Sequence, residues 1–310
     1  METRTKDPGV RAGTLQAGEP AIGGRGEAAG QPGGAAAAPW ATRGPEGPPR
    51  TAPHLQTLLA TLAATLALLP ALLAAPVATA AQDEPTWTVE LEGGPVWQSY
   101  NDAEIPNDGT ATRFSVEGIT GSGPWPAGRL YLTWRPATRH ALRFLAAPLT
   151  IRETGTAPAD VVFQGATFQG GVPVEATYTF DSWRLTYRYR LHEGDATRAW
   201  IGFTAKLRDA VVALEQGATE RVKTDLGFVP LLHLAGSWRF APRWTASLDA
   251  DALAGGPGRA VDAALEVGYD LTPKWTAQLG YRTVEGGADV EEVYSFAWLH
   301  YAAVSLVWRP

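Results

Sequence analysis

The alternation of apolar and charged side chains between residues 182 and 191 limits the fold more than any other feature of this chain. In the stretch "SWRLTYRYRL", three arginines and a threonine share one parity. The other parity holds only apolar and aromatic residues: Trp183, Leu185, Tyr187, Tyr189 and Leu191. Successive side chains of a β-strand point to opposite faces, whereas a helix would scatter both kinds around its axis. The segment is therefore predicted to be a strand with one apolar face and one strongly cationic face.

The same period of two continues from Asp83 onward, with almost no helical periodicity. We expect an all-β fold with ten strands. They are predicted at about 86–98, 128–135, 139–151, 173–191, 198–213, 229–240, 243–254, 259–271, 274–285 and 295–308. Twelve strands are the alternative if 110–120 and 161–169 also span, and eight would require some of the ten to merge.

Short and long connections alternate between these strands. The short ones, "RPATRH", "FAPRW" and "LTPKW", each contain a proline, which cannot donate to a strand ladder and therefore ends a strand. The longer ones are rich in Gly, Asp, Asn and Pro, and lie at about 100–127, 152–172, 214–228, 255–258 and 286–294. Alternating short turns and long loops are typical of membrane barrels that have both termini on one side.

Tryptophan gathers at the strand ends that adjoin the short turns. On the predicted strands seven aromatic residues fall at one level of the apolar face: Trp87, Trp134, Tyr189, Trp238, Trp244, Trp275 and Trp308. A ring of aromatic side chains at one level is typical of a bilayer interface. We therefore expect the apolar stripes to face lipid and the arginines to face the lumen. A soluble periplasmic barrel that binds an apolar ligand, with the stripes inverted, is the alternative.

From about residue 86 to 308 the chain resembles the bacterial outer-membrane β-barrel proteins of the small-barrel class. The resemblance rests on the "TPKW" and "APRW" turns, the aromatic girdle and the final strand "YAAVSLVW". It implies a closed antiparallel transmembrane β-barrel in the outer membrane, monomeric, in contact with outer-membrane lipids and lipopolysaccharide. It also implies recognition by the barrel-insertion machinery, although here Trp308 is followed by Arg309 and Pro310. No particular activity follows, because one fold carries many functions.

Residues 1–81 differ in composition from the predicted barrel. Residues 1–53 are rich in Gly, Ala, Pro and Arg without apolar periodicity, and are predicted to be a disordered low-complexity segment, interpreted as an extension introduced by the gene model. Residues 54–81 combine a basic flank, an apolar run broken by Pro70 and a small-residue cleavage pattern, which predict a cleaved signal peptide. An uncleaved transmembrane anchor is the alternative. Residues 82–310 would then form the barrel.

The parity opposite the apolar face gives the predicted lumen. Its basic members are Arg143, Arg184, Arg188, Arg190, Lys206, Arg208 and Arg282, and its acidic members are Glu90, Glu92, Asp249, Asp251, Asp262 and Glu266. A barrel of about ten strands is only slightly wider than its own side chains, so opposed charges are expected to pair. We predict a salt-bridged plug with a structural, surface or limited-permeation role. A polar pathway, or a site for an anionic ligand on the arginines, is the alternative.

Catalytic patterns are weak. If Phe240 pairs with Trp244 across its turn, His233 lies opposite Asp251, which would supply a base and its orienting carboxylate. Ser237 lies about 13 Å along the strand from His233, too far to be the nucleophile. The absence of cysteine removes thiolate chemistry, no histidines have metal-ligand spacing, and a net charge of −6 argues against nucleic-acid binding. We expect no cofactor and no metal, and no enzyme at this pair; a lipid-active outer-membrane enzyme is the alternative.

Overall fold

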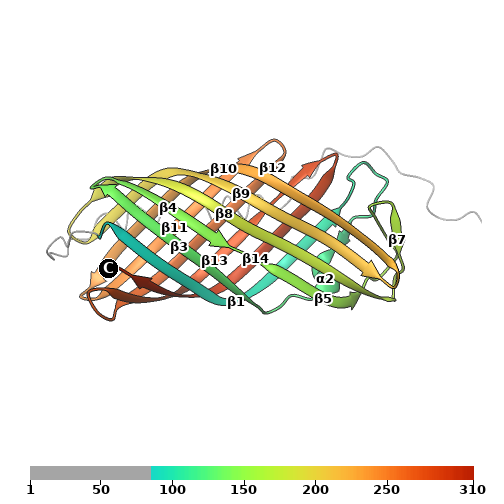
Figure 1. Ribbon diagram of the computed structural model, residues 1–310, viewed down its shortest axis with the longest axis horizontal. Helices are drawn as coiled ribbons and strands as arrows, with labels where there is room; N and C mark the ends of the chain where they lie inside the picture. Colours follow the sequence, from blue (N-terminus) through green and yellow to red (C-terminus); the bar gives the residue numbers. More distant parts are fainter. Residues whose placement is uncertain (1–84) are drawn as a thin grey trace, which may run out of the picture. The chain divides into compact units, whose positions relative to one another are not determined.

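The computed structural model describes residues 85–310, which are almost entirely β-structure (Figure 1). The long strands are β1 (Trp87–Glu104), β3 (Trp125–Ala137), β4 (His140–Ala147), β5 (Thr150–Thr156), β8 (Pro173–Glu193), β9 (Thr197–Gln216), β10 (Thr219–Ala241), β11 (Trp244–Gly255), β12 (Gly258–Asp270), β13 (Trp275–Val290) and β14 (Val293–Trp308). The short elements are β2 (Phe114–Ser115), α2 (Val116–Thr120), β6 (Val161–Phe163) and β7 (Ala166–Phe168). The predicted low-complexity segment 1–53 and signal peptide 54–81 lie outside the described residues.

The long strands form a closed antiparallel barrel. Each strand pairs with its neighbour in the order β14-β13-β12-β11-β10-β9-β8-β4-β3-β1, and β14 also pairs with β1, from Val89 opposite Trp308 to Glu104 opposite Tyr294. Since β4 and β5 both pair with β8, they are two halves of one strand interrupted at Pro148 and Leu149. This confirms the prediction of ten barrel strands. Segments 110–120 and 161–169, which would have made twelve, lie outside the barrel strands.

Three of the predicted long loops are wrong. The segments 214–228, 255–258 and 286–294 are hairpins in which strands continue on both sides, so that only 217–218, 256–257 and 291–292 remain as turns. The polar residues of 214–228 were expected to end the strands, but backbone pairing extends from Gln216 opposite Thr219 down the whole hairpin. Gly217 takes the turn at φ 61°, a conformation that suits glycine. Polar composition therefore marks where a strand leaves the apolar band and not where it ends.

The two remaining long connections fold into one end of the barrel, which we call the loop end. There β2, α2, β5 and the β6–β7 hairpin surround an apolar core that includes Ile105, Ile119, Ile151, Phe163 and Phe168. Helix α2 was not predicted, because one turn of helix leaves no periodicity to detect. It packs directly on β5, where a Cβ on Gly155 would lie 2.0 Å from the carbonyl oxygen of Ile119. The opposite end, which carries Pro85, the short turns and Pro310, we call the termini end (Figure 1).

The outside of the barrel is apolar. Exposed large apolar side chains lie on each of the ten barrel strands and on most of them share one parity, among them Phe203, Leu226, Phe228, Leu265, Leu279 and Val304. The other parity points inward and contains buried arginines, aspartates and glutamates. An apolar exterior around a polar interior is the architecture of a transmembrane β-barrel, and it is the reverse of the soluble alternative.

No helix within residues 85–310 is long and apolar enough to span a membrane.

Candidate functional site

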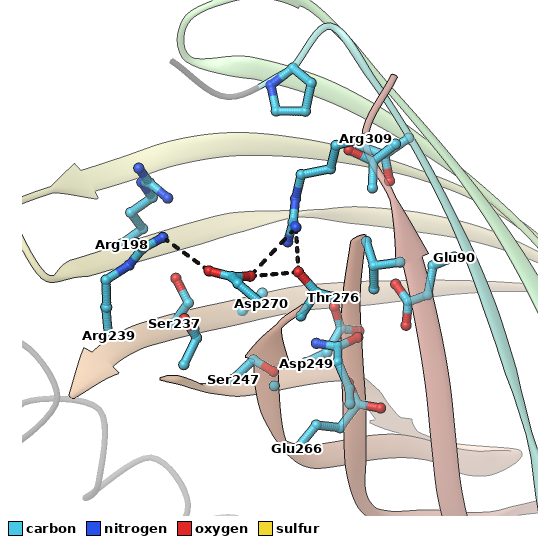
Figure 2. Close-up of a pocket in the computed structure, with 18 of the residues that line it drawn as sticks. Glu90, Arg198, Ser237, Arg239, Ser247, Asp249, Glu266, Asp270, Thr276 and Arg309 are labelled. Carbon is cyan, nitrogen blue, oxygen red and sulfur yellow. Dashed lines mark hydrogen bonds and ion pairs between the residues drawn. The ribbon is translucent and has the colours of Figure 1, made fainter. Parts of the chain in front are cut away.

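A wide polar cavity opens at the termini end. Its volume is about 870 Å³, and both Pro85 and Pro310 lie on its wall. Figure 2 shows polar side chains from several strands turned into this cavity. At its mouth Asp270 accepts a 2.6 Å hydrogen bond from Thr276 and lies 3.8 Å from Arg309 and 3.9 Å from Arg239. The lumen therefore admits water from this side.

The cavity ends at a layer of charged side chains. Six residues from six different strands meet here, and we call them the ionic layer: Glu92, Arg129, Arg184, Asp251, Asp262 and Arg282. Each is at most 5% exposed. Three carboxylates face three guanidinium groups, so the formal charges cancel. Such cancellation is needed because an unpaired charge in a water-poor interior costs several kcal/mol.

Asp262 lies at the centre of the ionic layer. Its carboxylate accepts from Arg129 Nη2 at 2.8 Å, and it lies 2.7 Å from Arg184 Nη2 and 2.6 Å from Arg282 Nη1. One aspartate on β12 thus ties β3, β8 and β13 together across the lumen. The contact with Arg282 joins neighbouring strands, whereas the contacts with Arg129 and Arg184 cross the lumen and depend on the closed barrel.

Arg282 holds the second carboxylate of the layer. It donates from Nε and Nη2 to the two oxygens of Glu92, at 2.9 Å and 2.8 Å, which is the bidentate geometry that suits guanidinium and carboxylate. The Tyr131 hydroxyl donates to Glu92 at 3.2 Å and accepts from Arg129 at 2.9 Å. The layer is therefore a continuous hydrogen-bonded network.

A second set of charges faces the cavity just below the layer. Asp249 accepts from Arg143 at 2.5 Å and from Arg188 at 3.1 Å, and Arg143 also reaches Glu90 at 3.1 Å. The carboxylates of Glu90, Glu92 and Glu266 approach within 4.8 Å of one another, a grouping with the composition of a cation site. Arginine already neutralises Glu90 and Glu92. Ser305 donates to Glu266 at 3.3 Å.

Three predicted lumenal residues have other partners. Arg190 pairs with Glu193 at 2.8 Å near a turn at the termini end. Arg208 pairs with Asp225 on the neighbouring strand β10. Lys206 is buried, with its ammonium 4.6 Å from the centre of the Phe180 ring.

The His233–Asp251 pair is present, and it belongs to the ionic layer. The two residues are opposite each other on β10 and β11, with His233 Nδ1 2.8 Å from Asp251 Oδ1. Asp251 also accepts from Thr204 at 2.7 Å and from Arg184 at 2.9 Å. Within residues 85–310 nothing hydrogen-bonds to Nε2 of His233, so no hydroxyl stands where a nucleophile would be needed. Through Asp251 the pair is joined to Arg184 and so to the ionic layer.

Sequence reasoning missed two members of the network. Arg129 and Tyr131 share the inward parity of β3, opposite the exposed Leu130 and Leu132. The same alternation rule would have found them, but the predicted strand was placed from its apolar members only.

Beyond the ionic layer the lumen is filled. Between the described residues, the voids next to the layer and toward the loop end measure about 10 Å³ and about 30 Å³. The first could hold at most one water molecule and the second scarcely more. The apolar core of the loop end lies above them.

Aromatic side chains cluster on the exterior at the termini end. Trp87 stacks on Trp134 with ring centres 5.9 Å apart, and Trp275 stacks on Trp308 at 6.2 Å. Trp244 lies 4.8 Å from Tyr269. Tyr189 and Trp238 are partly buried neighbours of His140 and Phe240.

Comparisons with known proteins identify no family for this chain. Searches with protein-family models and among curated proteins gave no match. Among solved structures the chain is similar to the outer membrane protease OmpT from Escherichia coli, with 12% identity and a TM-score of 0.39 over 74% of this chain and 98% of that one. The translocator domain of the autotransporter NalP from Neisseria meningitidis gives 10% and 0.37 over 83% and 98%. Neisserial surface protein A gives 12% and 0.32 over 73% and 97%.

Likenesses at these scores support no functional assignment. The strand pairing and the apolar exterior of the chain itself give it the fold of the outer-membrane β-barrel proteins.

Proposed function

We propose that this chain is an outer-membrane barrel whose lumen is closed to solutes and whose function is carried by its surfaces. The observation that carries the proposal is the ionic layer, which joins strands from all sides of the lumen with at most 5% of any member exposed. Above it the apolar core of the loop end fills the remaining width. Two successive seals leave no route for an ion or a nutrient.

The membrane placement is supported by the exterior. Leucine, valine and phenylalanine side chains exposed around the ten strands of the barrel would aggregate in water, whereas acyl chains solvate them at no cost. The stacked tryptophans Trp87, Trp134, Trp275 and Trp308 fit the periplasmic interface, where an indole keeps its ring in lipid and its N–H near water. The loop end then faces outward, in contact with lipopolysaccharide, and a monomer suffices because the barrel closes on itself.

Conductance across a planar lipid bilayer tests the closed lumen. The full chain, purified from outer membranes, is expected to insert without discrete conductance steps. As a matched comparison, Asp262→Asn keeps the volume of the side chain but removes the central negative charge of the ionic layer. Discrete conductance steps in the native protein, with an ion selectivity that differs in Asp262→Asn, would show that ions pass through the lumen. That result would overturn the proposal.

Fractionation tests the location. Cells that express the full chain are separated into soluble, inner-membrane and outer-membrane fractions, and boiled and unboiled samples are compared on a denaturing gel. A closed barrel in the outer membrane is expected to migrate differently without boiling. A soluble, heat-insensitive band would refute the membrane placement.

A further inference from the structure

Three polar side chains meet on the outer surface where the barrel closes. Ser99 on β1, His300 on β14 and Tyr281 on β13 belong to adjacent strands (Figure 1). Ser99 Oγ lies 2.6 Å from His300 Nε2, and the Tyr281 hydroxyl lies 2.5 Å from His300 Nδ1. The imidazole therefore bridges a serine and a tyrosine through its two nitrogens. All three belong to the exterior and take no part in the ionic layer.

The local fold explains why the serine reaches the histidine. Trp97 is opposite His300 in the β1–β14 ladder, and the register shifts between Gln98 and Tyr100. Ser99 is the extra residue of this β-bulge; it keeps the outward parity of Trp97 and is exposed. Bulges are over-represented beside active sites.

The imidazole ring is held between two aromatic rings. Tyr281 stacks on His300 at 6.0 Å with an interplanar angle of 22°, and Trp298 approaches it at 5.0 Å. Trp298 is itself fixed by a 2.7 Å hydrogen bond from Nε1 to Thr283 Oγ1. The histidine is thus oriented by a hydrogen bond and by two neighbouring rings, an arrangement that keeps Nε2 aimed at Ser99.

The position of the cluster along the barrel matches the ester region of a bilayer. His300 precedes Trp308 by eight residues on β14. Eight residues of a strand tilted by about 40° rise by roughly 20 Å, and the apolar band of such barrels is about 25 Å tall. With Trp308 at the periplasmic interface, His300 lies within about 5 Å of the outer boundary of the hydrocarbon, close to the ester bonds that join acyl chains to their headgroups.

Charged side chains begin directly beyond this level. Glu285, opposite Trp298 in the β13–β14 ladder, accepts from the Tyr100 hydroxyl at 2.6 Å and pairs with Arg259 at 2.7 Å. An ion pair on the same stretch of exterior marks the headgroup region. The Ser99–His300–Tyr281 cluster therefore lies between lipid-facing leucines and a charged rim, where both an acyl ester and water are present.

We propose that Ser99, His300 and Tyr281 form a serine hydrolase site that cleaves carboxylic esters of outer-leaflet lipids. This inference goes beyond the closed-lumen proposal and rests on its membrane placement. A lipid reaches the site by lateral diffusion, so an open surface serves as well as a cleft. The shared substrate chemistry is an O-linked acyl chain, which phospholipids and the lipid moiety of lipopolysaccharide both contain.

The reaction uses the tautomer with its proton on Nδ1, which donates to the Tyr281 oxygen. Ser99 Oγ attacks the ester carbonyl while its proton passes to Nε2 of His300. The tetrahedral intermediate expels the alcohol of the lysolipid, which takes that proton, and the acyl group remains on Ser99. Water then attacks the acyl-serine, gives a proton to Nε2, and the fatty acid leaves as Ser99 recovers its proton. One ester and one water yield one alcohol and one acid.

Ser99 and His300 are the catalytic residues of this proposal, and Tyr281 is a positioning residue. A neutral tyrosine stabilises the imidazolium less than a carboxylate would, so a modest turnover is expected. The bulge removes Ser99 from the ladder register.

The chain offers a matched control on the same exterior. His140 Nδ1 lies 2.8 Å from the Tyr187 hydroxyl, which repeats the histidine–tyrosine half of the cluster. This pair adjoins a turn at the termini end and, among residues 85–310, has no serine hydrogen-bonded to it. Substitution of His140 therefore changes an exposed histidine of the same kind without touching the proposed site.

The test measures fatty acid release by the full chain purified from outer membranes. It is supplied with vesicles of phosphatidylethanolamine and phosphatidylglycerol, or with purified lipopolysaccharide, and a long-chain fluorophosphonate probe reports a reactive serine independently. Native protein and His140→Gln are expected to release fatty acid and to be labelled. Ser99→Ala and His300→Gln are expected to lose release by at least about 100-fold, since general-base catalysis contributes that much. Tyr281→Phe is expected to lower kcat about tenfold with little change in KM.

The outcomes separate this inference from the placement on which it rests. Heat-modifiable migration shows that each variant is folded. Release from one lipid source only supports the site and identifies the substrate. A heat-modifiable native protein that releases no fatty acid from either source and is not labelled overturns the hydrolase site alone, as does full activity in Ser99→Ala. A soluble, heat-insensitive native protein overturns both proposals.

Discussion

Two histidines of this barrel have complementary surroundings. His233, in the ionic layer, has a carboxylate at 2.8 Å and no nucleophile, and it is 1% exposed. His300, on the exterior, has a serine at 2.6 Å and a tyrosine at 2.5 Å, and no carboxylate among residues 85–310 hydrogen-bonds to it. The inner pair has the carboxylate that orients an imidazole, but it is buried. The outer cluster has a weaker orienting group and the whole bilayer as a substrate reservoir.

The role of a polar cluster depends on whether water and lipid can reach it as much as on which residues form it. Inside the closed lumen, charges must pair because nothing else solvates them, and the result is stability. On the exterior at the bilayer interface, water and lipid both have access, so polar groups there cost little and are free to react. The predictions below use the free energy of unfolding to sharpen this contrast, from the largest expected loss to the smallest.

Arg282→Ala is expected to have the largest effect. It removes the bidentate partner of Glu92 and one of the three arginines of Asp262, so the buried layer keeps one uncompensated negative charge, which should cost about 3–5 kcal/mol. Urea unfolding of the refolded protein in lipid vesicles, followed by tryptophan fluorescence, measures the loss. Arg113→Ala is the control, because the Arg113–Glu104 pair is surface-exposed and should contribute at most about 1 kcal/mol. If both variants lost the same free energy of unfolding, the ionic layer would contribute no more to stability than a surface ion pair.

His233→Ala is expected to come second. It removes one hydrogen bond from Asp251 and opens a small void, while Arg184 and Thr204 still hold the carboxylate. A loss of about 2 kcal/mol is expected in the same unfolding measurement. Fatty acid release should stay at the native rate. If release disappeared while the barrel remained folded, the lumenal pair and not the exterior cluster would be the reactive one.

Thr283→Val should have a smaller effect. It removes the acceptor of the Trp298 indole N–H, which should cost about 1 kcal/mol or less, because the indole can turn toward interfacial water. Trp298 then holds His300 less firmly, so a decrease of a few fold in ester hydrolysis should accompany the small loss of stability. Unchanged hydrolysis would mean that stacking contributes nothing to the orientation of the imidazole.

Ser99→Ala should have the smallest effect on stability, within about 0.5 kcal/mol of the native value, because its side chain is exposed and packs against little. The same substitution is expected to abolish hydrolysis. If this variant keeps the native free energy of unfolding but no longer hydrolyses esters, the exterior cluster serves catalysis, whereas the ionic layer serves stability. A loss of several kcal/mol would instead mark Ser99 as a structural member of the bulge.

The sequence by itself determined the strands, their number and which face is apolar. Alternation along a strand is local, since it needs only the period of two that the backbone imposes, and so Trp183, Arg184 and Leu185 already separate the two faces. It also placed His233 opposite Asp251, because a tight hairpin sets the register of its two strands. It misjudged 214–228, since polar residues mark the edge of the membrane as readily as the end of a strand.

The tertiary structure decided which distant residues meet. Asp262 binds arginines from three strands that are far apart in the sequence, and only closure of β14 onto β1 brings them across one lumen. The same closure, together with one bulged residue, moves Ser99 next to His300 although 201 residues separate them. A register shift of a single residue is not encoded in the alternation, because it depends on how two strand ends fit once the barrel is closed.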